Sequence, residues 1–256
     1  MGFFTQLDRL YQEGDLVKTE AFIKEEASRH EGTDKAAILN ELGSFYRGTS
    51  RYPESESAFR EAVSLLENAG QAQSPAHATI LMNLAGTYRP SRQYDRAEEL
   101  FLHAIHVLDE EEYAYVSALN NLSLVYQDQG KFNQAEDLIQ KSLRWMEAHG
   151  SPAHEMATTW NNLANVYLQK GDLSAAEKTV EKALVIYEAM PERNSHHAAA
   201  ATTMGQICYL RGNLDRAERL FRQALELTEH FFGKNMEYNM ILQNLELVHM
   251  ARERNS

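Results

Sequence analysis

The sequence predicts an all-α repeat fold, with six pairs of helices followed by one C-terminal helix. Three observations support this prediction. The chain of 256 residues contains six similar segments. Each segment carries apolar residues at helical spacing. Glycine and proline, with 13 and 5 residues, are too few for many long loops.

When the copies are aligned, one position, here called a column, always holds an apolar residue. This residue recurs at intervals of 42, 38, 41, 41 and 41 residues. The column consists of Leu42, Leu84, Leu122, Leu163, Met204 and Leu245. Nearly every residue falls within a copy, so we expect one domain over residues 1–256. The helix pairs are predicted at about 3–30, 35–69, 76–109, 114–149, 153–190 and 195–232, and the last helix at about 235–252.

The first helix of each pair is clearest in the fifth copy. Trp160, Leu163, Ala164 and Tyr167 lie at positions i, i+3, i+4 and i+7, which form one face of a helix. Gly171 is expected to end this helix, because glycine accepts the left-handed conformation that follows a helix terminus.

The second helix of the same copy is predicted to begin with a capping box. Ser174 is followed three residues later by Glu177, the spacing at which two side chains cap each other's backbone N–H groups. The same slot holds Asp95 with Glu98, Asn133 with Glu136, and Asp215 with Glu218.

Small residues recur at one position in each helix, which indicates that the paired helices approach closely. The first helices carry Gly43, Ala85, Ser123, Ala164 and Gly205. The second helices carry Ser55, Ala97, Ala135, Ala176 and Ala217.

The pattern made by these positions resembles the tetratricopeptide repeat. The matching residues in the fifth copy are Trp160, Leu163, Ala164, Tyr167, Ala176, Val180 and Ala183. That repeat has about 34 residues. The copies here have 41, and this longer form is similar to the repeats of kinesin light chains. The resemblance implies a right-handed α-α superhelix whose first helices line a concave groove, and a role in protein–protein interaction.

Composition and motifs argue against several classes of function. Lys and Arg number 25 against 37 Asp and Glu, so the formal net charge is −12. This charge disfavours nucleic acid and anionic membranes as partners, since their phosphates reward basic patches. With no apolar run of the ~18 residues that a membrane span needs, and no secretory signal at the start, we expect a cytoplasmic protein.

Known catalytic and cofactor motifs are missing from the sequence, including phosphate-binding loops, dinucleotide fingerprints and zinc-protease motifs. His103 and His106 have no third metal ligand in their flanks. Cys208 stands in the tyrosine column of the repeat without a basic activator nearby in sequence. We therefore expect no enzyme activity, no cofactor and no metal.

Candidate binding residues lie beside the packing stripe of the first helices. One column consists of Glu41, Asn83, Asn121, Asn162, Thr203 and Asn244. Asparagine in mid-helix costs roughly 0.5–0.7 kcal/mol relative to alanine, so its recurrence needs a reason. A carboxamide both donates and accepts hydrogen bonds and could pair with the backbone of a bound peptide. Alternatively, each asparagine bonds to the adjoining helix and fixes the packing of the repeats.

Neighbouring columns extend the candidate site to Asn165, Thr158, Arg47, Arg89 and Gln127. The arginines favour a partner with an acidic segment, unless they pair with carboxylates of the chain itself. We therefore predict a scaffold or adaptor, a monomer or weak dimer, that holds an extended segment or helix of a protein partner in its groove. Two alternatives remain open: a sensor of a signalling peptide, and a module that self-associates through its terminal helix.

Overall fold

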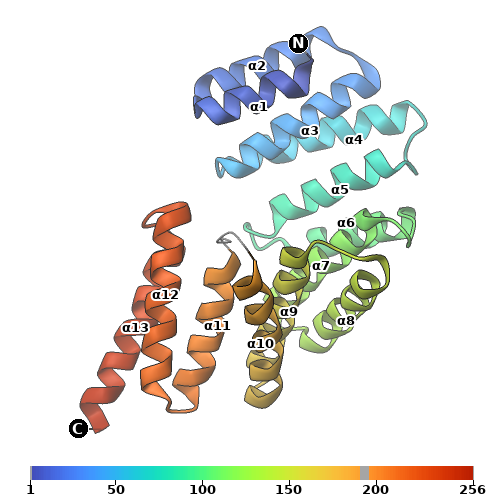
Figure 1. Cartoon of the computed structure of the whole chain (residues 1–256). Coiled ribbons are helices and arrows are strands. Elements are labelled where there is room, and N and C mark those ends of the chain that lie inside the picture. Colours follow the sequence, from blue (N-terminus) through green and yellow to red (C-terminus); the bar gives the residue numbers. More distant parts are fainter. Residues whose placement is uncertain (1, 191–195, 256) are drawn as a thin grey trace. The chain divides into compact units, whose positions relative to one another are not determined.

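The computed structural model describes residues 2–190 and 196–255, and this part of the chain contains thirteen helices and no strand (Figure 1). The helices are α1 (Phe3–Glu13), α2 (Leu16–Arg29), α3 (Gly32–Gly48), α4 (Tyr52–Asn68), α5 (Pro75–Tyr88), α6 (Tyr94–Val107), α7 (Tyr113–Asp128), α8 (Phe132–His149), α9 (Ala153–Gln169), α10 (Leu173–Ala189), α11 (His196–Leu210), α12 (Leu214–Phe232) and α13 (Met236–Asn255). The prediction of an all-α fold with six helix pairs and a thirteenth helix is confirmed. The predicted start of the sixth pair at residue 195 lies outside the described residues.

The chain forms two compact units, Met1–Gln129 with α1–α7 and Gly130–Ser256 with α8–α13. Within each unit every helix contacts the next one along the chain. The first helices of successive pairs also contact each other, α3 with α5 and α5 with α7 in one unit, α9 with α11 and α11 with α13 in the other. Each unit therefore has a face built by consecutive first helices, which we call the first-helix face. The predicted single domain over 1–256 stays a prediction.

The small residues lie where the two helices of a pair meet, as predicted. Ala176, Ala135, Ala97 and Ala217 are completely buried. Gly43 lies directly under the Phe59 ring, since a Cβ atom there would be 2.7 Å from it. The Ser55 hydroxyl donates a 2.8 Å hydrogen bond to the Gly43 carbonyl oxygen. Larger side chains at these positions would separate the paired helices.

The second helices begin two residues earlier than the predicted capping boxes require. The residue that caps α10 is Asp172, whose carboxylate accepts a 2.9 Å hydrogen bond from the Ala175 N–H. Gly171 before it has φ 79°, which confirms the predicted end of the first helix. Glu177 is thus beyond the first turn of α10, so the capping-box prediction is wrong. Neither Gln93 nor Lys131, the caps of α6 and α8, makes a side-chain capping bond.

A leucine in place of Ala176 should lower the free energy of unfolding by roughly 1–3 kcal/mol, because it overpacks the contact between α9 and α10. Val185 on the same helix is 64% exposed, and Val185→Leu is the matched control with little expected effect. Chemical denaturation followed by circular dichroism measures both variants. A neutral result for Ala176→Leu would show that the α9–α10 pairing is assigned incorrectly.

Candidate functional site

The predicted asparagine column lies on the first-helix face, where it joins consecutive first helices. In the first unit, the Asn83 amide of α5 donates a 2.9 Å hydrogen bond to the Asn40 Oδ1 of α3. In the second, the Thr203 hydroxyl of α11 donates to the Asn165 Oδ1 of α9 at 3.1 Å. At these positions, polar side chains hold successive repeats together.

Other members of the column form no hydrogen bond to another helix in the described part of the chain. Asn121 is exposed, and its amide donates only to the carbonyl oxygen of Ser117, one turn earlier in α7. Asn162 and Asn244 are half-buried, and their side chains make no hydrogen bond with any residue that the structure describes. These three carboxamides keep donors and acceptors for a ligand. The column therefore serves packing at some positions and stays available at others.

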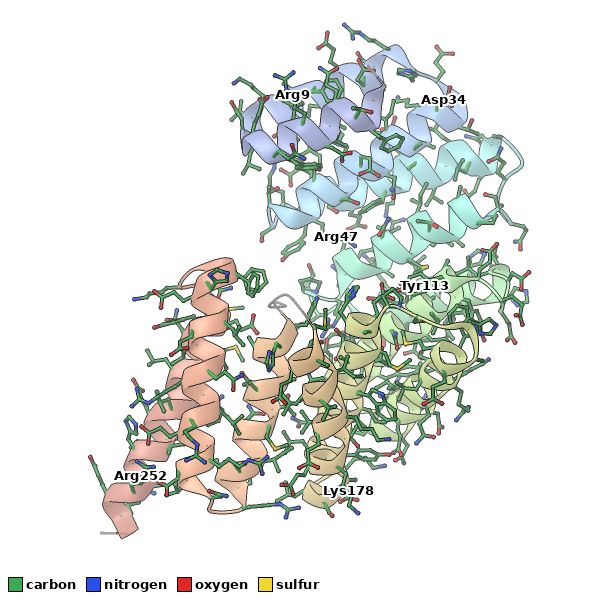
Figure 2. All side chains as sticks on the ribbon, viewed as in Figure 1. Arg9, Asp34, Arg47, Tyr113, Lys178 and Arg252 are labelled. Atoms are coloured by element: carbon green, nitrogen blue, oxygen red, sulfur yellow. The ribbon has the colours of Figure 1, made fainter. Side chains whose placement is uncertain are left out.

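The two arginines predicted to bind an acidic segment are already engaged within the first unit. Arg47, labelled near the end of α3 in Figure 2, donates a 3.1 Å hydrogen bond to the Asn83 carbonyl oxygen. Its guanidinium lies against Gly86, where a Cβ atom would be 2.7 Å from Nη1, and burial lowers its pKa. Arg89 forms a 2.6 Å ion pair with Asp128 of α7. Each arginine thus bridges two neighbouring first helices.

Two predicted binding residues, Thr158 and Gln127, do not join consecutive first helices among the described residues. The Thr158 hydroxyl bonds to the Tyr187 hydroxyl at 2.9 Å and to the His154 carbonyl oxygen, so it faces the second helix of its own pair. Gln127 has a buried Nε2 atom with no hydrogen-bond partner in the described ranges. Of the nine predicted site residues, only Arg47 and Asn83 are joined by a described hydrogen bond.

Sequence reasoning missed a recurring contact between repeats. In the second helix of each pair a glutamate follows the small residue, or Thr19 in the first pair. In four copies this glutamate accepts a hydrogen bond from the tyrosine of the next first helix. These pairs are Tyr46–Glu20, Tyr88–Glu56, Tyr126–Glu98 and Tyr167–Glu136, with oxygen–oxygen distances of 3.0, 2.8, 3.1 and 2.9 Å. The recurrence of this glutamate in all six copies was the available signal, but four of the six were assigned to capping boxes.

Burial and the neighbouring carboxylate stabilise the protonated forms of Tyr88, Tyr126 and Tyr167. The pKa of Tyr126 is raised to about 12, first by desolvation and then by the charge of Glu98. The pKa values of Tyr88 and Tyr167 are raised for the same two reasons. The phenol therefore remains a hydrogen-bond donor at neutral pH.

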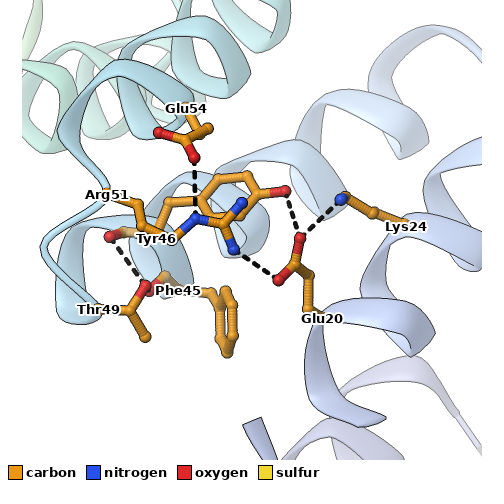
Figure 3. A network of polar contacts seen from close by, with 7 residues as sticks. All are labelled: Glu20, Lys24, Phe45, Tyr46, Thr49, Arg51 and Glu54. Carbon is orange, nitrogen blue, oxygen red and sulfur yellow. Dashed lines mark hydrogen bonds and ion pairs between the residues drawn. The ribbon is translucent and has the colours of Figure 1, made fainter. Parts of the chain in front are cut away.

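Cations complete several of these contacts. Figure 3 shows Glu20 accepting from Tyr46 while Lys24 and Arg51 bind the same carboxylate, both at 2.6 Å. These hydrogen bonds, that of Lys24 first, lower the pKa of Glu20 to about 2. The Arg51 guanidinium also lies 4.4 Å from the centre of the Tyr46 ring. The network joins α2 to α3 and to the start of α4.

The tyrosine is replaced at the end of the second unit, and arginines take over its contacts. Cys208 stands in the tyrosine column, is buried, and has a pKa raised by desolvation. Arg211 binds Glu177 of the preceding repeat at 3.1 Å. Arg252, labelled in α13 in Figure 2, binds Glu218 at 2.6 Å. A raised pKa keeps the Cys208 thiol protonated, which is unfavourable for a nucleophile.

The described ranges contain neither a cluster of metal-binding side chains nor a membrane-spanning helix. No group of three or more His, Cys, Asp or Glu residues there could hold a metal ion. None of the helices in residues 2–190 and 196–255 is both long and apolar enough to cross a bilayer.

Comparison with known proteins agrees with the helix-pair geometry. A family model described as tetratricopeptide repeat matches residues 34–110, 115–189 and 155–230, which is more than half of the chain. The chain belongs to the tetratricopeptide repeat family. No curated protein sequence matches it.

Solved tetratricopeptide repeat structures of the kinesin-light-chain type are similar in fold. BtubC (BKLC) from P. vanneervenii has a TM-score of 0.64 and 20% identity, over 90% of this chain and 89% of that one. A putative kinesin light chain from Podosopora anserina, with nearly identical TPR-like repeats, has a TM-score of 0.63 and 18% identity, over 79% of this chain and 99% of that one. At these identities the similarity shows the fold alone.

Replacing Glu20 by Gln should lower the melting temperature at pH 6 and flatten its pH dependence below pH 5. The pKa of Glu20 is about 2 in the folded state, against an ordinary value of 4.5. The contribution of Glu20 to the free energy of unfolding is therefore present above pH 4.5 and is lost as the pH falls towards 2. Thermal melts between pH 2 and 6 test this expectation.

The control for this experiment is Glu25→Gln, since Glu25 is 59% exposed and pairs with Arg29 within the same helix. A pH profile of Glu20→Gln that parallels the profiles of both the wild type and this control would contradict the role assigned to the network.

Proposed function

We propose that the chain is a non-catalytic interaction module that holds an extended segment or helix of a partner protein against the first-helix face of either unit. Membership of the tetratricopeptide repeat family supports a role in protein–protein interaction. The finer proposal rests on the carboxamides of Asn121, Asn162 and Asn244, none of which is hydrogen-bonded to another helix among the described residues. They can pair with the backbone of a bound chain whatever its side chains.

We propose that the protein works in the cytoplasm, because a reducing compartment suits its one buried cysteine. It includes no acidic preference for the partner. Arg89 already pairs with Asp128, and Arg47 donates to a carbonyl oxygen of α5, so neither guanidinium is held ready for a ligand.

A selection from a displayed library of random linear peptides tests this proposal. The wild-type chain should enrich peptides that bind in the micromolar range, since ordering a flexible peptide limits its affinity. Failure to enrich any linear peptide would overturn the proposed binding mode.

Combining Asn121→Ala with Asn162→Ala should weaken the binding of enriched peptides severalfold, because each lost hydrogen bond contributes about 0.5–1.5 kcal/mol. The melting temperature should change little, since neither side chain joins two helices. The matched variant Asn83→Ala removes the bond to Asn40 and should lower the melting temperature instead. Unchanged affinity together with a lower melting temperature in the double variant would show that the column is structural throughout.

Self-association is a second candidate function, favoured by one observation. Met236, Met240, Leu247 and Met250 lie on one side of α13 and are 79%, 58%, 45% and 49% exposed. The opposite side packs into the second unit through Ile241, Leu245 and Val248. A second copy could cover the exposed stripe, and sedimentation analysis over a range of concentrations would detect the resulting dimer.

A further inference from the structure

The first unit contains an apolar pocket on its first-helix face. The pocket has a volume of about 260 Å³ and lies between α1, α3, α5 and the end of α4. Ala36, Ile80 and Leu66 form its buried apolar wall. Ala37 and Thr79 line its exposed part. Short side chains at Ala36, Ala37, Ala76 and Thr79 leave this space between α3 and α5.

Glu41 places a carboxylate in this pocket. It is half-buried, and the one hydrogen bond it accepts in the described structure comes from the Asn40 amide at 3.2 Å. The oxygen of that amide accepts from Asn83, so the Asn40 side chain is held with its nitrogen towards Glu41. Desolvation raises the pKa of Glu41, and the nearby charge of Asp8 raises it further.

Glu41 differs from the glutamates of the second helices in its lack of a cation. Glu20, Glu136 and Glu218 each bind a lysine or arginine within 3 Å. No lysine, arginine or histidine within residues 2–190 and 196–255 forms an ion pair with Glu41. A half-buried carboxylate beside a second negative charge is electrostatically unsatisfied, and a positive charge supplied from outside would stabilise it.

One aromatic side chain of α1 lines the pocket, and a second lies near Glu41. Phe4 lines the pocket and is 59% exposed. Tyr11 is close enough to Glu41 for the carboxylate to contribute to the rise of its pKa. Aromatic faces next to a carboxylate favour organic cations, because both groups attract positive charge.

We propose that this pocket receives a lysine or arginine side chain of the partner segment, with its aliphatic stem along Ala36 and Ile80 and its charged head at Glu41. The proposal rests on the proposed function, and it specifies the partner as basic at this point. An aliphatic stem with a cationic tip matches a pocket that is apolar inside and acidic at one edge.

A small probe tests the pocket without any peptide. Hexylammonium carries an alkyl chain and one cationic head, and 1-hexanol is its neutral control. Titrations followed by amide resonances of Ala37 and Thr79 should show that the wild type binds hexylammonium roughly fivefold more tightly than 1-hexanol. Equal affinities for the two probes would overturn the proposal.

Substitutions test whether Glu41 causes the preference for hexylammonium over 1-hexanol. Glu41→Gln should bind both probes equally, while Glu25→Gln, with the same change of charge on α2, should keep the fivefold preference. Ala37→Leu fills the pocket and should weaken both probes, with its amide spectrum confirming that it is folded. A preference retained in Glu41→Gln would contradict the assignment.

Peptide selection separates this inference from the proposed function. Wild-type chain should enrich peptides with lysine or arginine beside an apolar residue, and Glu41→Gln should enrich peptides without that bias. Peptides enriched by the wild type with no basic bias would overturn only the inference. Enrichment of no peptide by the wild type would overturn the proposed function itself.

Discussion

Close contact between the two helices of each pair is the constraint on which the structure depends. The paired helices meet at positions where glycine, alanine or serine is completely or almost completely buried, such as Ala176 and Ser55. At Gly43 there is no room even for a methyl group unless the Phe59 ring shifts. The close contact between paired helices fixes the first-helix face, because each first helix takes its orientation from the second helix on which it packs.

A second set of contacts joins one pair to the next and is largely electrostatic. The tyrosine of one first helix donates to a glutamate of the preceding second helix, and lysines or arginines neutralise several of these carboxylates. These groups lie at the edge of the apolar core, where a hydrogen bond to a charged group is stronger than in water. The apolar residues drive the stacking, and the tyrosine–glutamate pairs determine which turn of one helix faces which turn of the next.

The sequence predicted the helix pairs and their packing positions well, because both follow from local periodicity. It failed where one side chain could serve two purposes. Glu177 had the spacing of a capping residue, yet α10 starts at Leu173 and Glu177 binds Arg211 of the following repeat. Arg47 appeared available to a ligand, but its hydrogen-bond acceptor is a carbonyl oxygen 36 residues away, which no local pattern specifies. The pocket at Glu41 also depends on Phe4 of another helix, so it required the tertiary structure.

The tyrosine–glutamate contact bears on how such a chain can grow or shrink during evolution. The second, third and fourth copies each supply a tyrosine to the copy before and a glutamate to the copy after. After duplication or loss of a complete unit, a tyrosine therefore still meets a glutamate where two copies adjoin. Loss of half a unit would instead bring two first helices or two second helices together. The glutamate carboxylate would then lose its tyrosine donor. Gene rearrangements tolerated by this architecture should consequently occur in multiples of the whole period.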